Sequence, residues 1–165
     1  MENLAENIIL TKNIELTPNL LENYKQELIN KLNEYYNEKC FIDHGFVKSV
    51  NPSIKIIGNI ISRVNCNIIF NVEFTINAIT VFIDKKFAMV VDKISPRHII
   101  GNIEEKISVL LRVDTLKKYV FENDYFIWGK NKINIGSKIC VKVEKVKYKN
   151  ADEIMVIVKY CKILK

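Results

Sequence analysis

The chain has 165 residues and a formal net charge of +6, from 25 Lys and Arg against 19 Asp and Glu. With 48% hydrophobic and 27% charged residues, and only 5 Gly and 3 Pro, the composition excludes disordered, collagen-like and low-complexity chains. No apolar run approaches the roughly 20 residues of a membrane span. The first residues, Met1–Glu6, are acidic. We therefore expect no membrane partner and no secretory signal.

The positive charge is concentrated in the second half of the sequence. Residues 1–83 contain 7 basic and 9 acidic side chains, whereas residues 84–165 contain 18 basic and 10 acidic ones. Such asymmetry indicates two modules, of which the second meets a polyanion. The alternative is a solvated surface rich in Lys, because the abundance of Lys, Ile and Asn also fits an AT-rich genome.

The first half predicts a strand, a helix and three more strands. A strand is expected at Ile8–Leu16. Thr17 and Pro18 then open a helix that runs to about Glu38, with apolar residues three and four apart on one face. Strands are expected at 45–50 and 54–61. A third, at 68–76, has strict alternation of apolar and polar residues. This order indicates a compact α+β domain over residues 1–83.

The second half predicts only strands. We expect five of them, at 87–94, 107–113, 119–128, 139–148 and 153–164, with turns at 134–137 and 149–152. Five strands in about 80 residues suit a small closed barrel of the OB type, which we assign to residues 84–165. The alternation within 139–148 changes phase near Glu144 and Lys145, which predicts a bulge.

The residues give little sign of catalysis, and we expect no cofactor and no metal. The glycines are isolated, without the Gly-Lys-Ser/Thr of a phosphate-binding loop. Asp43 and His44 come nearest to a catalytic pair, and a turn explains them better. The four cysteines (Cys40, Cys66, Cys140 and Cys161) are too scattered for a disulfide framework or a zinc ribbon, which indicates a reducing compartment. The chain is therefore not expected to be an enzyme on its own.

Basic residues interleaved with aromatic ones suggest contact with nucleic acid. Five rings fall within residues 119–128, beside Lys117 and Lys118. OB barrels bind single strands by stacking bases on exposed rings and following phosphates with Lys and Arg. The alternatives are that these rings belong to the core and the lysines are merely solvated. Our candidates are Lys85, Lys86, Lys93, Arg97, Arg112, Lys117, Lys118, Tyr119, Phe121, Lys142, Lys145, Lys147 and Lys149.

The order of segments resembles a known family. Residues 14–18 followed by a long helix, Cys40 followed by Gly45–Val50, Ile57–Ile60, 68–74 and 135–143 resemble successive segments of the stalk subunit of multisubunit DNA-directed RNA polymerases. This family includes the seventh subunit of RNA polymerase II and its archaeal counterpart. It joins an α+β tip domain to an S-one-type OB barrel, and the resemblance covers about residues 8–164.

Two family motifs are missing. The family has Gly-Asp-Gly near residues 64–67, and Phe-x-Pro-x-x-Gly-Glu where this chain has residues 82–88 without Pro or Gly. With the short length and AT-rich composition, these losses make the chain most similar to the stalk subunits of cytoplasmic large DNA viruses such as poxviruses. That implies a location in the virion and host cytoplasm; otherwise a nuclear or cytoplasmic compartment is expected.

The resemblance implies a division of labour between the halves. The tip domain would dock on the large polymerase subunits near the clamp, and the barrel would meet nascent RNA or promoter DNA. A companion similar to the fourth subunit of RNA polymerase II is possible within this family. The docking residues implied are Leu16, Pro18, Leu20, Gly58, Asn59, Ile60, Ile61 and Arg63.

Three alternatives stay open from the sequence. Gly58 can be a bulge glycine without any role in docking. The whole protein can be a free-standing OB-fold protein that binds single-stranded nucleic acid. It can also be a protein-interaction module without affinity for nucleic acid.

Overall fold

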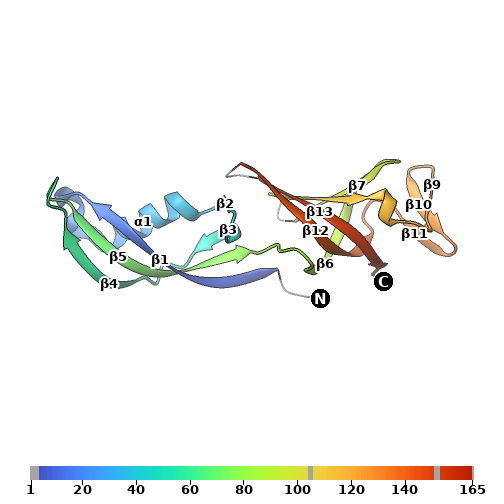
Figure 1. Ribbon diagram of the computed structural model, residues 1–165. Coiled ribbons are helices and arrows are strands. Elements are labelled where there is room, and N and C mark those ends of the chain that lie inside the picture. The colour runs from blue at the N-terminus through green and yellow to red at the C-terminus, as the bar shows by residue number, and fades with distance from the viewer. Residues whose placement is uncertain (1–3, 104–105, 151–152, 165) are drawn as a thin grey trace. The chain divides into compact units, whose positions relative to one another are not determined.

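The computed structural model describes residues 4–103, 106–150 and 153–164. Its contacts divide the chain into two compact units (Figure 1): Ala5–Ile79, which we call the α+β unit, and the remaining described residues, which we call the barrel unit. The division falls at 79/80, whereas the sequence suggested 83/84. No helix among the described residues is long and apolar enough to cross a membrane.

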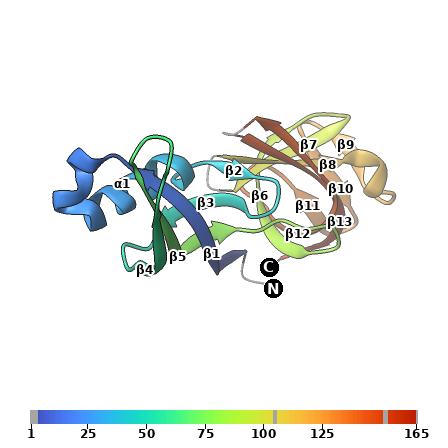
Figure 2. The same ribbon diagram turned by 60° about the vertical axis from the view of Figure 1, so that its left-hand side comes forward.

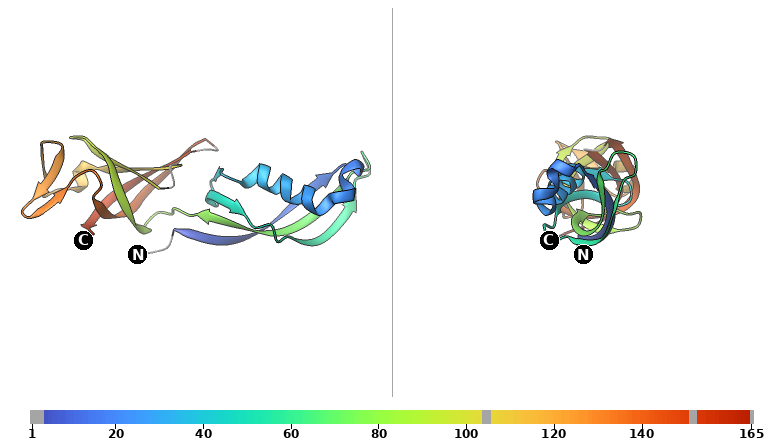
Figure 3. Two further views of the ribbon diagram at one scale, coloured as in Figure 1. Left: turned by 180° about the vertical axis from the view of Figure 1, so that it is seen from behind. Right: turned by 90° about the vertical axis from the view of Figure 1, so that its left-hand side faces the viewer.

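The α+β unit has one antiparallel sheet with a helix on one face (Figure 3). Its elements are strand β1 (Ala5–Leu16), 3₁₀ helix η1 (Pro18–Asn23), helix α1 (Tyr24–Tyr36), β2 (Cys40–Phe41), β3 (Gly45–Val50), β4 (Lys55–Ile61) and β5 (Ile68–Ile79).

The central strand of this sheet is β5. It pairs along its full length with β1, from Leu16 opposite Ile68 to Ala5 opposite Ile79. On its other side β4 takes the first half and β3 the second half. The alternation predicted for this strand is confirmed: Phe70, Val72, Phe74 and Ile76 are buried and Asn71 is exposed.

The buried face of α1 carries Leu28, Leu32 and Tyr36, and it packs on the inward residues of β1 and β5. The Tyr36 ring lies 5.2 Å from Phe74, and Tyr24 stacks on Phe70 at 5.5 Å. Residues spaced four apart fall on one side of a helix, which is why this stripe forms the core.

The predicted helix begins differently from expectation. Pro18 occupies a first-turn position, but the first six residues form a 3₁₀ turn and the α-helix starts only at Tyr24. Thr17 stands before that turn without a side-chain cap; its carbonyl accepts the Leu20 N–H at 3.0 Å. The helix ends at Tyr36, since Glu38 has a φ of 56°. Asn23 accounts for the break, because Asn favours caps and turns over helix interiors.

The barrel unit contains a closed barrel and a small second sheet (Figure 2). Its elements are β6 (Lys86–Ile94), β7 (His98–Ile103), β8 (Ile107–Arg112), 3₁₀ helix η2 (Val113–Thr115), β9 (Val120–Glu122), β10 (Tyr125–Trp128), β11 (Asn131–Ile133), β12 (Lys138–Asn150) and β13 (Glu153–Ile163).

Five strands close the barrel in the order β12-β13-β8-β7-β6, with β6 and β12 completing the ring. All neighbouring pairs are antiparallel except β8 and β13, which are parallel. The interior is filled by alternate residues of every strand, such as Phe87, Ile99, Val109, Val141 and Val156. The predicted closed barrel is thus confirmed in its strand number.

One barrel strand differs from the prediction. The segment 119–128 was expected to be a barrel strand, but β9 and β10 form a hairpin in a separate sheet with β11. Asn123 and Asp124 both have positive φ, 44° and 63°, which is the turn geometry of a two-residue hairpin loop. The fifth barrel strand is instead β7, which the sequence analysis missed.

The barrel bends where the alternation slips. The bulge predicted near Glu144 and Lys145 is confirmed, because the β12–β13 register shifts between Val143 and Lys145. The β6–β7 register also shifts, between Val91 and Lys93, where β6 turns over β7. Opposite this bend stands Gly101, where a Cβ would lie 2.3 Å from the Val90 carbonyl oxygen and 2.7 Å from Met89 Cγ.

We expect Gly101→Ala to lower the free energy of unfolding by about 1–3 kcal/mol, because the added methyl group overpacks the barrel. Denaturant unfolding followed by far-ultraviolet circular dichroism measures this. Gly58→Ala is the matched control, since nothing lies within 4 Å of its Cβ position. Equal stability of the two variants would contradict the close approach at Gly101.

Candidate nucleic-acid interface and docking strand

The small sheet presents an exposed tryptophan beside fixed side chains of the barrel. Trp128 ends β10 and is 45% exposed. The connection from η2 to β9 is a tight turn, in which the Tyr119 N–H donates to the Leu116 carbonyl at 2.8 Å. The Thr115 hydroxyl donates to the Arg112 carbonyl and accepts the Tyr160 N–H. These bonds fix the connection to β13.

A concave site of about 220 Å³ lies here, which we call the aromatic pocket. Its lining residues are Thr115, Leu116, Lys117, Lys118, Tyr119, Trp128 and Tyr160. The Tyr119 ring meets Trp128 edge-on at 5.9 Å, and the Lys118 ammonium lies 4.9 Å from the centre of the Trp128 ring. An exposed ring with cations beside it is suited to stacking a base and contacting its phosphate.

Tyr119 and Tyr160 form a half-buried wall of the aromatic pocket. Their hydroxyl oxygens share a hydrogen bond at 2.8 Å, and their rings meet edge-on at 5.5 Å. Burial is the main reason that the pKa of Tyr160 is raised well above its usual value, and the bond to Tyr119 adds to the rise. The Tyr160 phenol therefore stays neutral near physiological pH.

The structure assigns the rings of residues 119–128 unequal positions. Tyr119 and Phe121 were the predicted stacking residues, but both are half-buried, and Phe121 packs against buried Phe126 at 5.1 Å. Trp128 and Tyr160 were missed. The exposure of Trp128 has a signal in the sequence, since it directly precedes Gly129 at a turn. Tyr160 belongs to another strand, and no local pattern indicates it.

Three lysines follow the outer face of β12. Lys145, Lys147 and Lys149 are exposed, and the intervening Val146 and Tyr148 are half-buried, so the predicted spacing by two is confirmed. Lys149 forms an ion pair with Glu153 at 3.2 Å. Among the described residues, Lys145 and Lys147 form no ion pair. These two cations are therefore available to an external anion.

Lys86 and Lys142 lie directly opposite each other where β6 meets β12, and Lys142 is also opposite Lys159 of β13. Asp84 accepts from Lys142 at 2.7 Å. That hydrogen bond and charge lower the pKa of Asp84 and raise the pKa of Lys142. Glu144 holds Lys159 at 2.9 Å. Carboxylates thus neutralise two of these three lysines, Lys142 and Lys159.

The other predicted cations lie around the barrel in several settings. Lys93 is exposed near the end of β6, and Arg97 is exposed in the connection to β7. Arg112 is opposite His98 in the β7–β8 ladder and forms an ion pair with Asp114. Lys85 is half-buried and donates to the Thr80 hydroxyl at 3.1 Å. Of the predicted residues, the structure places one group in or beside the aromatic pocket and a second group, Lys145, Lys147 and Lys149, along β12. The other predicted cations are spread over the surface of the barrel unit.

The predicted docking residues divide between surface and core. Leu16 is completely buried and so offers no surface to a partner, whereas Leu20 is half-buried against the same core. The strand expected at 54–61 is present as β4, so Gly58–Ile61 lie in a strand, and the connection to β5 spans 62–67. Branched Ile side chains favour the extended strand. Gly58 adjoins a register shift, as the bulge interpretation required.

The exposed strand β4 nevertheless forms an apolar edge. Ile57, Ile60 and Ile61 are 54%, 65% and 69% exposed. A hollow of about 300 Å³ lies beside them, lined by Asn13, Ile57, Gly58, Asn59, Ile60, Ile69 and Asn71. Pro18 and Arg63 are exposed as well. Contiguous exposed apolar side chains are typical of protein-protein contacts.

Within residues 4–103, 106–150 and 153–164 no three His, Cys, Asp or Glu side chains gather as a metal site would require. Asp43 and His44 lie in the turn between β2 and β3. A scan against protein-family models finds no family that matches this chain. A search of curated proteins likewise returns no match.

We expect Tyr119→Phe to lower the free energy of unfolding of the barrel unit by about 1 kcal/mol, the net value of a lost hydrogen bond. Trp128, the only tryptophan, reports this by fluorescence during denaturant unfolding. Tyr125→Phe is the matched control, because no described residue hydrogen-bonds to the Tyr125 hydroxyl. An unchanged midpoint for Tyr119→Phe would refute the role of the Tyr119–Tyr160 bond.

Proposed function

We propose that the chain is a non-catalytic stalk subunit of a multisubunit DNA-directed RNA polymerase. The observation that carries this proposal is the order of its two units: a strand-helix-strand unit with one helix, followed by a closed five-stranded barrel. The same order characterises the family that the sequence resembles. The large subunits would supply the catalytic carboxylates and metal ions.

The barrel suits the OB type in its strand order. Its first three strands (β6, β7 and β8) are consecutive neighbours, and the last strand, β13, lies between β8 and β12. OB folds bind oligonucleotides with the face of their second and third strands and with the loops after the first and fourth. Arg97 follows the first strand here, and Lys149 lies at the end of the fourth.

The nucleic-acid contact in this proposal combines a stacking residue with a phosphate track. Trp128 and Lys118 would hold one base, while Lys145, Lys147 and Lys149 would follow the backbone of nascent RNA or promoter DNA. The charge of the units supports this division, because the α+β unit has 7 basic and 8 acidic residues and the remaining chain has 18 and 11. Phosphate-binding surfaces require such an excess of cations.

The docking contact would use the exposed β4 edge. A partner could cover Ile57, Ile60 and Ile61 without disturbing the core, because their side chains already face solvent. Burial of these residues against the large subunits near the clamp would release ordered water and stabilise the complex. A viral origin, with a place in the virion and host cytoplasm, and a companion resembling the fourth subunit also belong to this proposal.

Replacing Ile60 and Ile61 with Asp should release the protein from the large polymerase subunits, because charges would be buried at the contact. Affinity purification of the tagged chain from producing cells, followed by mass spectrometry, measures the stoichiometry. Ile42→Asp is the control, since Ile42 is 73% exposed outside β4. If the wild-type chain brings down no large polymerase subunits, it is a free-standing binder or interaction module. If the double variant still brings them down, docking lies elsewhere.

The barrel should bind single-stranded RNA with an affinity that falls steeply as salt rises. Replacing Lys145, Lys147 and Lys149 with Gln should reduce the slope of log affinity against log salt by up to roughly 2 units, at about 0.7 per phosphate contact. Fluorescence anisotropy with labelled oligouridine across a salt series measures the slope.

Two controls separate the contributions. Lys25, Lys48 and Lys55 changed to Gln remove the same charge from exposed positions of the α+β unit and should leave the slope unchanged. Trp128→Ala should weaken binding at every salt concentration by about 1–3 kcal/mol, the value of one stacked base, without altering the slope. A slope that both triple variants reduce equally would favour a merely solvated Lys face.

A further inference from the structure

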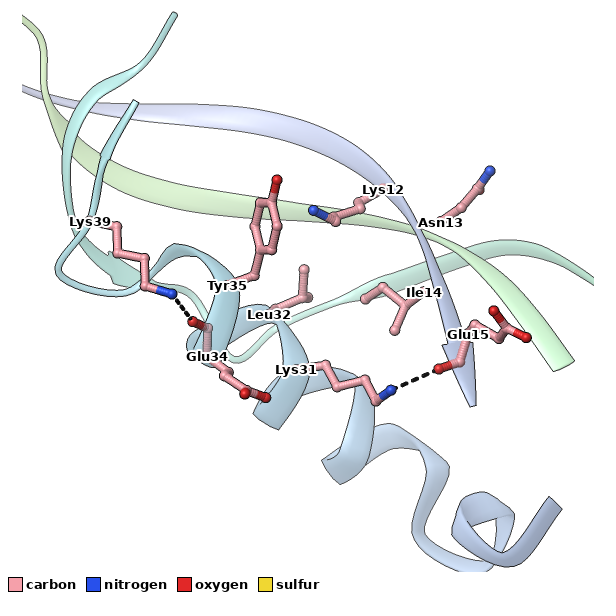
Figure 4. A pocket seen from close by; sticks show the side chains of 9 residues that line it. All are labelled: Lys12, Asn13, Ile14, Glu15, Lys31, Leu32, Glu34, Tyr35 and Lys39. Carbon is pink, nitrogen blue, oxygen red and sulfur yellow. Dashed lines mark hydrogen bonds between the residues drawn. The ribbon is translucent and has the colours of Figure 1, made fainter. Parts of the chain in front are cut away.

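The α+β unit contains a pocket that neither proposed contact uses. It has a volume of about 390 Å³ and lies between β1 and α1. We call it the lysine pocket; Figure 4 shows its lining residues: Lys12, Asn13, Ile14, Glu15, Lys31, Leu32, Glu34, Tyr35 and Lys39. The β4 residues that form the docking edge are absent from its lining.

The bottom of the lysine pocket is apolar and one wall is aromatic. Ile14 and Leu32 are buried core residues that lie between the surrounding lysines in Figure 4. Tyr35 is 49% exposed, and the Lys12 ammonium lies 2.8 Å from the centre of its ring. The pocket therefore offers a ring and aliphatic surface to an apolar group.

Three ammonium groups surround this apolar centre. Lys31 donates to the Glu15 carbonyl at 2.9 Å, and Lys39 donates to the Glu34 carbonyl at 2.6 Å. These bonds orient two lysines through backbone oxygens and leave each ammonium with two further N–H groups. Within the described ranges, none of Lys12, Lys31 and Lys39 forms an ion pair with a carboxylate.

One of the two carboxylates that line the pocket is already engaged by side chains outside it. Glu15 accepts hydrogen bonds from the Asn65 and Asn67 side chains at 2.7 and 2.8 Å. These two bonds are the main reason that its pKa is lowered, and the charge of Lys31 contributes least. The protein thus holds three cations around a concave surface, and Asn65 and Asn67 engage one of its two lining carboxylates, that of Glu15.

We propose that the lysine pocket binds an acidic peptide segment of a partner protein. A Glu or Asp side chain of the peptide accepts from the lysine ammonium groups, and a neighbouring apolar side chain packs on Tyr35 and on the surface above Leu32. This inference does not depend on the proposed function.

A peptide fits the surroundings better than a nucleic acid does. Glu15 and Glu34 also line the pocket, and the unit has one more acidic than basic residue, so its field does not attract a polyanion. A peptide needs only one or two carboxylates, and its backbone N–H groups can donate to the Glu34 carboxylate. Phosphodiester chains have neither the apolar side chain nor such donors in their backbone.

The test uses the full ¹⁵N-labelled chain and the capped peptide acetyl-Leu-Asp-Glu-Leu-amide. Its neutral isostere is acetyl-Leu-Asn-Gln-Leu-amide. We expect the acidic peptide to shift the amide signals of residues lining the lysine pocket, and the neutral isostere to bind at least tenfold more weakly. Lys12→Gln with Lys39→Gln should weaken the acidic peptide roughly tenfold, because two charge-assisted contacts are lost.

The matched control is Lys25→Gln with Lys55→Gln, which removes the same charge from exposed positions outside the pocket and should leave the affinity unchanged. Lys12→Met, which keeps an unbranched apolar side chain beside Tyr35, checks that lost affinity reflects lost charge. Equal binding of the two peptides, shifts outside the pocket, or no binding at millimolar concentration would overturn the proposal. So would inorganic phosphate or oligouridine displacing the peptide from the pocket at equal concentration.

Discussion

Closing five strands into a ring is the constraint on which the arrangement of the barrel unit depends. Neighbouring strands of so small a barrel must tilt and coil, and the pairing of Lys86–Val90 with Lys138–Lys142 completes the ring. The register shift after Val91 and the absence of a side chain at Gly101 allow β6 to turn over β7. The shift after Val143 lets β12 leave β6 and continue with β13 alone.

This closure also positions the candidate interface. Because β12 extends past its pairing with β6, Lys145, Lys147 and Lys149 stand on a segment that pairs only with β13, and their side chains are exposed. Because the chain leaves β8 through η2, it reaches the small sheet beside β13, where Tyr160 meets Tyr119. The aromatic pocket therefore depends on barrel closure, although Trp128 itself lies outside the barrel.

The sequence predicts those parts of the fold in which periodicity is strong. The stripe of α1, the alternation of β5 and the phase change in β12 all reflect repeated side-chain burial, and each was recognisable. The periodicity of apolar residues did not predict the strands correctly where the backbone conformation of a few residues determines the fold. Asn123 and Asp124 turn the chain without a glycine, and β7 is short and interrupted by Gly101. The expected barrel strand at 119–128 and the missed β7 both follow from this.

The candidate sites were predictable only in part, for a related reason. Spacing by two places Lys145, Lys147 and Lys149 on one face without knowledge of any partner strand. Pairings across the fold have no such local signal: Tyr160 beside Tyr119, Asp84 on Lys142, and Lys12 over Tyr35 join residues far apart in sequence. A run of basic residues thus predicts a charged surface, but the ion pair that neutralises Lys142 emerges only from the fold.

The two units differ in the net charge that surrounds their lysines, and this difference affects which class of partner each unit can attract. In the barrel unit cations outnumber anions, so even after local ion pairs form, Lys145 and Lys147 add to a field that attracts polyanions. In the α+β unit the charges nearly cancel, so Lys12, Lys31 and Lys39 act only at short range, within the hollow that they surround. A long-range field favours an extended phosphate chain, whereas a short-range cluster over apolar residues favours a single carboxylate with an apolar neighbour. The two arrangements therefore differ in the class of ligand that their charges favour, and each can be tested without the other.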